Sequence, residues 1–214
     1  MFTVDCLTVF SPFNSNCYFI RREGERETYL VDPGGDAELI LRFIADNKLQ
    51  PKGIWLTHGH LDHLGAVAAV NQTLNVPVHI HALEKEWCSS AKLNGSQTFG
   101  LSYEPFEPTG LWQDADEFEA LGSTWRILLT PGHSPGSVCI INREAKIAFS
   151  GDLILGGAVG RTDLPGGDEM ILFHSLKRLF TEEKGLRLYP GHYDDSTMEV
   201  EAKHNAYVQF ALKG

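Results

Sequence analysis

The sequence lacks a long hydrophobic run, a basic N-terminal region and any cluster of positive charge, and each absence excludes a class of protein. No stretch approaches the roughly 20 apolar residues that a membrane helix needs, so no membrane span is expected. The N-terminus has no apolar core and its first basic residue is Arg21, which argues against a signal peptide. A cytoplasmic protein without membrane attachment is therefore predicted.

Positive charge is scarce along the whole chain. Its 18 lysines and arginines are outnumbered by 28 aspartates and glutamates, which gives a formal net charge of −10 over 214 residues. Basic residues occur in pairs at most, as at Arg21-Arg22 and Lys177-Arg178. Because nucleic acids are bound largely through clustered lysine and arginine, we expect no nucleic-acid partner.

Cysteine is scarce too, and the four residues form no Cys-x-x-Cys motif. They are Cys6, Cys17, Cys88 and Cys139. Three of them lie in or beside apolar segments, where an unpaired cysteine packs as a small hydrophobic residue. Buried, reduced thiols are therefore predicted, as is usual in the cytosol.

The hydrophobic pattern predicts strands followed by helices, repeated twice, which is typical of an α/β fold with two similar halves. In the first half, strands are predicted over 2–10, 17–22, 28–31, 53–56 and 78–80, with helices over 37–47, 64–73 and 83–91. In the second half, strands are predicted over 117–120, 124–129, 137–142, 146–149 and 186–189, with helices over 168–180 and 197–212.

Three local features sharpen this outline. Asp36 is predicted to cap the helix that follows it. The helix over 168–180 is expected to bury a stripe formed by Met170, Ile171, Phe173, Leu176 and Leu179. Residues 92–115 show weak periodicity and are predicted to form a long loop containing Trp112, or a lid over a site.

The most informative segment contains three histidines and an aspartate within six positions, directly after a predicted buried strand. These residues are His58, His60, Asp62 and His63. Imidazole and carboxylate groups are common ligands of zinc, iron and manganese. His58 and His60 are two positions apart, whereas Asp62 and His63 begin the next helix and point elsewhere. The spacing therefore predicts two neighbouring metal sites rather than one site with four ligands.

Three further candidate ligands follow other apolar strands. His133, Asp152 and His192 each come directly after a glycine at a predicted strand end. A glycine at such a point lets the backbone approach a bound group closely. An isolated aspartate or histidine of this kind more often serves a turn, but seven such residues in this order point to chemistry.

The motifs HxHxDH, PGHxPGS, SGD and PGH, in this order, resemble those of the metallo-β-lactamase superfamily. The length, the Asp-Pro-Gly-Gly at 32–35 and the segment 160–168 make the chain most similar to its short glyoxalase II-like (hydroxyacylglutathione hydrolase-like) members. The resemblance implies an α/β fold that is a four-layer αββα sandwich. It also implies one hydrolase domain over 1–214, without the C-terminal helical domain that binds glutathione in glyoxalase II.

The resemblance further implies a pair of divalent metal ions, with zinc expected and iron or manganese as alternatives. It assigns His58, His60 and His133 to one metal, and Asp62, His63 and His192 to the other. Asp152 is implied as the bridge between them. A water shared by two such cations has a pKa of about 7, so a bridging hydroxide is expected to attack a carbonyl. Asp62 and Asp152 are thus the candidate catalytic residues, and Asp62 is also a candidate proton relay.

The implied substrate is a small-molecule thioester of the S-lactoylglutathione type. Arg161 matches a basic residue that contacts glutathione in the family, and Tyr193 lies beside the last metal histidine. Two positions depart from the family pattern, because Asp163 and Asp194 stand where tyrosines are expected. Glutathione recognition is therefore an open question at the level of sequence.

Other interpretations remain open. The Gly-Arg-Thr-Asp at 160–163 also resembles persulfide dioxygenases of the same superfamily, which use one iron held by two histidines and an aspartate. Hydrolysis of another ester, a lactone or a lactam is a further alternative. A non-enzymatic binding module would tolerate replacement of Asp152. The four remaining histidines are expected to be structural or exposed: His79, His81, His174 and His204.

Overall fold

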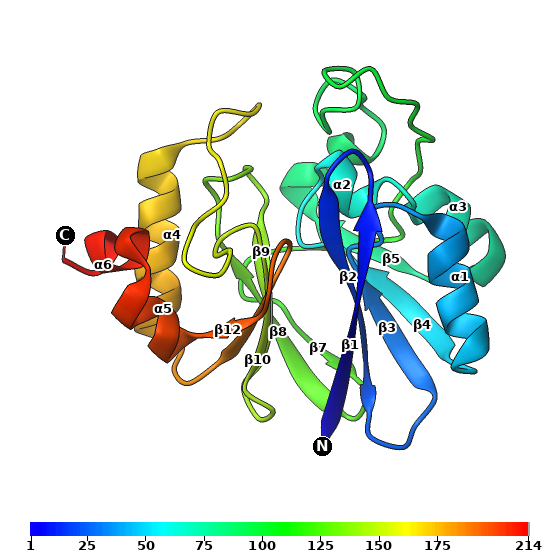
Figure 1. The fold of residues 1–214 in the computed structure, drawn as a ribbon, viewed down its shortest axis with the longest axis horizontal. Helices are drawn as coiled ribbons and strands as arrows, with labels where there is room; N and C mark the ends of the chain where they lie inside the picture. Colours follow the sequence, from blue (N-terminus) through cyan, green and yellow to red (C-terminus); the bar gives the residue numbers. More distant parts are fainter. Residues whose placement is uncertain (214) are drawn as a thin grey trace. The chain divides into compact units, whose positions relative to one another are not determined.

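The computed structural model describes residues 1–213, and the chain divides into two compact units, Met1–Trp112 and Gln113–Gly214. Each unit contains one six-stranded sheet with helices of its own (Figure 1). The α/β class predicted from the hydrophobic pattern is confirmed in both units. No helix of the described residues is long and apolar enough to cross a membrane.

The first unit has a sheet whose strands follow one another in chain order. They are β1 (Phe2–Phe10), β2 (Asn14–Arg22), β3 (Glu27–Val31), β4 (Gln50–Trp55), β5 (Val78–His81) and β6 (Gly110–Trp112). β1 to β3 are antiparallel, and β3 to β6 are parallel. Its helices are α1 (Ala37–Asp46), α2 (Leu61–Leu64), α3 (Val67–Leu74) and the 3₁₀ helix η1 (Ala82–Cys88).

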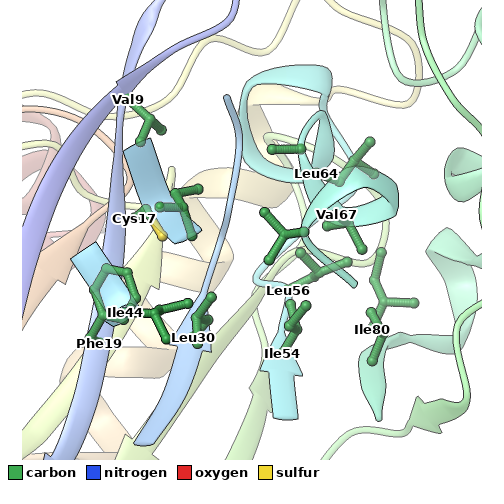
Figure 2. Packing of buried hydrophobic residues seen from close by; sticks show 14 of the residues in the cluster. Val9, Cys17, Phe19, Leu30, Ile44, Ile54, Leu56, Leu64, Val67 and Ile80 are labelled. Carbon is green, nitrogen blue, oxygen red and sulfur yellow. The ribbon is translucent and has the colours of Figure 1, made fainter. Parts of the chain in front are cut away.

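The core of this unit forms where the apolar faces of α1 and α3 meet the sheet. Strands alternate their side chains between faces, so Cys17 and Phe19 of β2 point to the same side, toward Leu30 of β3 (Figure 2). Ile40 and Ile44 lie one turn apart on α1, and both are buried. This packing fixes the carboxyl ends of β3 and β4, where the candidate ligands begin.

Three predictions for this unit were wrong in detail. Asp36 precedes α1 in a left-handed conformation, and its carboxylate accepts from Phe10 N instead of capping the helix. The helix predicted over 64–73 is divided into α2 and α3. Trp112 ends β6, which pairs with β5; a three-residue strand is too short to show any periodicity.

The second unit has the strand order β12-β11-β10-β9-β8-β7. Its strands are β7 (Glu117–Ala120), β8 (Ser123–Leu129), β9 (Val138–Asn142), β10 (Ile147–Gly151), β11 (Arg187–Pro190) and β12 (Ser196–Thr197), and its helices are α4 (Glu169–Glu182), α5 (Met198–His204) and α6 (Ala206–Lys213). Only the pairing of β10 with β11 is parallel among the described strands of this unit. α4 lies in the connection between these two strands.

The buried face of α4 differs from the predicted stripe. Met170 and Ile171 are 60% and 42% exposed, while the buried residues are Leu172, Ser175, Leu176, Leu179 and Phe180. The observed set follows the i, i+3, i+4 spacing of one helix face, and the predicted set spread over two faces. The last helix is also divided, because the buried Asn205 bonds Glu201 of α5 and the backbone amides of Tyr207 and Val208.

The four cysteines are free thiols. Cys17, Cys88 and Cys139 are buried as predicted, and burial raises the pKa of Cys88 and of Cys139 to about 12. Cys6 is exposed. These buried thiols therefore pack as neutral hydrophobic residues.

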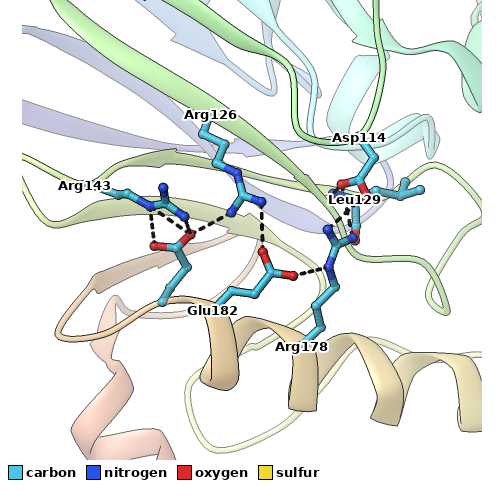
Figure 3. A network of polar contacts seen from close by, with 7 residues as sticks. Asp114, Arg126, Leu129, Arg143, Arg178 and Glu182 are labelled. Atoms are coloured by element: carbon cyan, nitrogen blue, oxygen red, sulfur yellow. Dashed lines mark hydrogen bonds and ion pairs between the residues drawn. The ribbon is translucent and has the colours of Figure 1, made fainter.

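A network of ion pairs joins the end of α4 to β8 (Figure 3). Glu183 is buried and accepts from Arg126 and Arg143. Glu182 accepts from Arg126 at 2.8 Å and from Arg178 at 2.7 Å, and these bonds hold the pKa of Glu182 below its usual value.

This network predicts a stability that depends on pH. Because the pKa of Glu182 is depressed in the folded state, its contribution is present above the unfolded pKa and is lost as the pH falls through the folded value. We expect Glu182→Gln to lower the free energy of unfolding by up to about 1 kcal/mol at pH 7, and by less at pH 3. Denaturant unfolding at both pH values measures this, with the exposed Glu25→Gln as the control. An equal loss at both pH values would contradict the prediction.

Candidate metal centre

The segment carrying four candidate ligands runs from the end of β4 into α2. His58 follows the buried strand, His60 precedes the first turn of α2, and Asp62 and His63 lie within that turn. The side chains of His58 and His63 are fully buried and their rings lie 4.0 Å apart, centroid to centroid. The predicted strand-end position of this segment is therefore confirmed.

Asp32, the first residue of the Asp-Pro-Gly-Gly motif, was not among the predicted ligands, but it organises this segment. Its Oδ1 accepts from Thr57 N at 2.8 Å, and its Oδ2 accepts from Thr57 Oγ1 at 2.6 Å and from His63 Nδ1 at 3.0 Å. A carboxylate only accepts hydrogen bonds, so Nδ1 of His63 carries the proton. In the neutral ring this leaves the lone pair on Nε2, as metal binding requires.

The same carboxylate also sets the state of His58 through Thr57. The hydroxyl of Thr57 donates to Asp32, so its oxygen is an acceptor toward Nδ1 of His58, 3.1 Å away. Nε2 of His58 then holds the lone pair as well. Ligand atoms of Asp32, His58 and His63 lie within 4.8 Å of one another. One buried aspartate thus sets the tautomer of two candidate ligands.

The second unit brings together its own three candidates. Asp152 follows β10, and its Oδ2 lies 3.5 Å from His133 Nε2 and 3.3 Å from His192 Nε2. His133 Nδ1 donates to the carbonyl oxygen of Arg161 at 2.7 Å. When its ring is neutral, His133 therefore turns the lone pair of Nε2 toward a carboxylate oxygen. Two electron-rich atoms facing each other in this way fit a bound cation, which would attract both.

Glycines let the backbone come close to these side chains. A Cβ added to Gly34, in the turn after Asp32, would overlap the carbonyl group of Asp62. A Cβ added to Gly160 would overlap the carbonyl oxygen of Asp152 and lie 2.8 Å from Nδ1 of His133. The glycine-rich turns noted in the sequence thus serve close approach to candidate ligands within each unit.

The two predicted substrate contacts lie at the surface of the second unit. Arg161 forms a two-point ion pair with Asp163, at 2.6 and 2.7 Å. Tyr193 is 73% exposed, has a φ of 65°, and its ring centroid lies 6.3 Å from that of His192. Arg161 also borders a cavity of about 170 Å³ that the sequence did not indicate. Its lining residues are Val159, Gly160, Arg161, Thr162, Glu169, Leu172, Phe173 and Tyr207.

The other histidines lie apart from these clusters, as expected. His79 stacks on Trp112, and burial lowers its pKa. His81 is buried and its Nδ1 accepts from Leu83 N at the start of η1. His174 and His204 are exposed on α4 and α5.

Comparison with known proteins agrees with this ligand chemistry. The sequence profile of the metallo-beta-lactamase superfamily matches residues 10–192. The hydroxyacylglutathione hydrolase GloC of Haemophilus influenzae is 33% identical over 201 residues, which cover 92% of this chain and 94% of that protein.

Two solved structures share the fold over nearly their whole length. The BLEG-1 B3 metallo-beta-lactamase is 32% identical with a TM-score of 0.91, over 99% of this chain and 100% of that one. The di-iron-bound form of TTHA1623 is 36% identical with a TM-score of 0.84, over 95% of this chain and 99% of that one. The fold expected from the motifs is therefore confirmed.

Proposed function

Because this chain belongs to the metallo-β-lactamase superfamily of metal-dependent hydrolases, we propose that it hydrolyses thioesters of the S-lactoylglutathione type with two bound metal ions. The matched profile extends across both units, so we propose that together they make one hydrolase domain. The name of the Haemophilus relative, a hydroxyacylglutathione hydrolase, supports the substrate class.

One observation carries the metal-dependent part of the proposal. His58, His63 and His133 each have a hydrogen-bond acceptor at Nδ1, which leaves Nε2 to donate to a cation. We assign His58, His60 and His133 to one metal and Asp62, His63 and His192 to the other, with Asp152 shared. Zinc suits this mixed nitrogen and oxygen set, and so do iron and manganese; the di-iron relative keeps iron open.

When bound, the two cations would polarise the substrate carbonyl and generate a nucleophile from water near neutral pH. The chain's own part is to hold the ligands rigidly and to keep them in the donating state. Asp32 and Thr57 do this for two histidines, and the Arg161 carbonyl does it for His133. Asp62 is half-buried and, beside its ligand role, is the carboxylate proposed to pass a proton to or from the substrate.

The test of this function is a substrate panel on protein of measured metal content. S-lactoylglutathione heads the panel, beside a neutral thioester, a lactone and a β-lactam, the last included because of the BLEG-1 neighbour. We expect thioester hydrolysis that chelation abolishes and added metal restores. If protein with both metal sites filled hydrolyses no thioester, the proposed substrate class is refuted. Hydrolysis of the β-lactam alone would show that β-lactams are the substrate class instead.

The persulfide dioxygenase alternative is tested in the same preparation. Its motif, Gly160 to Asp163, is present, and the backbone of this segment holds His133. Oxygen consumption with glutathione persulfide, by protein containing a single iron, would establish that activity in place of hydrolysis. We expect no oxygen uptake.

We expect the ion pair of Arg161 and Asp163 to affect the KM of a charged substrate more than that of a neutral one. The hydrogen bond from Arg161 lowers the pKa of Asp163 to about 2, so the carboxylate is ionised and able to pair with Arg161 near neutral pH. We expect Asp163→Asn to release the guanidinium and lower the KM for S-lactoylglutathione severalfold, with no change for a neutral thioester. Steady-state kinetics with both substrates measure this, and Asp46→Asn, at the exposed end of α1, is the control. An equal effect on both substrates would contradict it.

A further inference from the structure

Glu84 is a fully buried carboxylate that none of the chemistry above uses. It lies in η1, and its Oε2 accepts the backbone N–H of Gly59, the residue between His58 and His60. Acidic side chains are rarely buried in full unless their oxygens are satisfied. A carboxyl group offers acceptor oxygens whether it is neutral or ionised, so this contact is suited to holding the segment in place.

The packing around Gly59 leaves the segment little freedom. A Cβ on Gly59 would overlap the Cβ of Trp87 in η1 and lie 2.9 Å from Glu84 Oε2. On the other side of His60, Leu61 N donates to the carbonyl of Asn94 at 2.9 Å, and Asn94 Nδ2 donates to Trp87 O at 3.1 Å. η1 and the loop after it therefore pack against the segment that carries His58 and His60.

The anchored amides alternate along the segment. Thr57, Gly59 and Leu61 donate to Asp32, Glu84 and Asn94 respectively. The two residues between them are His58 and His60, whose side chains are the proposed ligands. His60, between Gly59 and Leu61, has the extended values φ −74° and ψ 151°, and in extended chain N–H groups two residues apart point the same way. The anchors thus fix the backbone on which both histidines stand.

We propose that Glu84 is a positioning residue, which holds the His58-Gly59-His60 backbone in the geometry that binds the first metal. This inference rests on the proposed function in one respect, the assignment of His58 and His60 as ligands. Glu84 acts through the Gly59 amide and touches neither substrate nor metal. Its removal changes metal affinity first, and activity only as a consequence.

The experiment measures zinc affinity of metal-free protein by competition with a chromogenic chelator. We expect Glu84→Ala to weaken zinc binding by about 10–100-fold, the usual range for groups that orient ligands. Glu84→Gln keeps an acceptor oxygen and should lose less. The control is Glu86→Gln, an exposed glutamate on the same helix, and it should bind zinc as the unmodified protein does.

Cobalt substitution supplies a second readout. The ligand-field spectrum should change in Glu84→Ala and return toward that of the unmodified protein in Glu84→Gln, whereas loss of stability alone would leave the spectrum of folded protein unchanged. If Glu84→Ala does not fold, Glu84→Gln and Glu84→Asp decide. Unchanged zinc affinity and spectrum in every variant that folds would overturn the proposal, and so would an equal loss in Glu86→Gln.

The two proposals fail in different ways. Tight zinc binding without thioester hydrolysis by the unmodified protein would end the proposed function, and the role of Glu84 would still be decided by the titration. Thioester hydrolysis together with unaltered zinc affinity in Glu84→Ala would end the Glu84 proposal alone.

Discussion

Replacing Asp152 with alanine is expected to lower bound metal from two ions per chain to one or none, and to reduce turnover by about a thousandfold or more. Its Oδ2 lies within 3.5 Å of Nε2 of both His133 and His192, so this one carboxylate oxygen could bind a cation beside either histidine. Without it, a cation at either histidine loses a charged ligand. Metal analysis and steady-state kinetics on the same protein sample measure the two effects.

The position of Asp152 is fixed by backbone contacts, so this effect belongs to its side chain. Gly191 N donates to the carbonyl of Gly151 at 2.9 Å, and Gly160 N donates to that of Asp152 at 2.8 Å. These bonds hold the segments of His192 and Arg161 beside the end of β10, and alanine preserves them. Asp46→Ala, at an exposed end of α1, is the control. Full activity of Asp152→Ala would refute the dinuclear hypothesis.

The sequence was sufficient to predict features that depend on local pattern. The nine-residue β1, the strands β2 and β3 and the strand ends before His58, His133 and Asp152 all follow from alternation and glycine punctuation. Prediction was wrong where tertiary contacts decide the outcome. β6 exists only because β5 pairs with it, and α4 turns Leu172 rather than Met170 inward because the sheet selects the face.

The residues that support the candidate ligands were missed for the same reason. Asp32 is 25 residues from Thr57 and 31 from His63, and parallel pairing of β3 with β4 aligns Val31 with Trp55 and so brings these segments together. Glu84 is likewise 25 residues from Gly59. For Asp32 a signal existed, since it is a carboxylate at the carboxyl end of a parallel strand. Glu84 had none, because a short 3₁₀ helix leaves no periodic trace.

Asp32→Asn should change the tautomer of His63 while leaving the stability of the fold largely intact. The asparagine oxygen would still accept from Thr57 N, but its amide N–H₂ would replace the Oδ2 that accepts from both Thr57 Oγ1 and His63 Nδ1. His63 would then accept at Nδ1 and carry its proton on Nε2, and the Thr57 hydroxyl could donate to Nδ1 of His58 with the same result there. A protonated Nε2 cannot bind a metal. We expect the zinc affinity to fall by about 10–100-fold at the site of His63 and also at the site of His58. Nitrogen shifts of the imidazole ring and a zinc titration report the tautomer and the affinity directly.

Asp32→Ala should add a loss of stability to this loss of metal. It leaves Thr57 N, Thr57 Oγ1 and His63 Nδ1 without their acceptor in a buried site, each at about 1–3 kcal/mol. It also places alanine at a φ of 53°, which aspartate and asparagine tolerate better. Asp36→Asn is the matched control, because Asp36 has a φ of 47° in the same turn and is exposed. If Asp32→Asn binds two zinc ions with unaltered affinity, the protonation of His63 is set by something other than Asp32, and the carboxylate serves the turn alone.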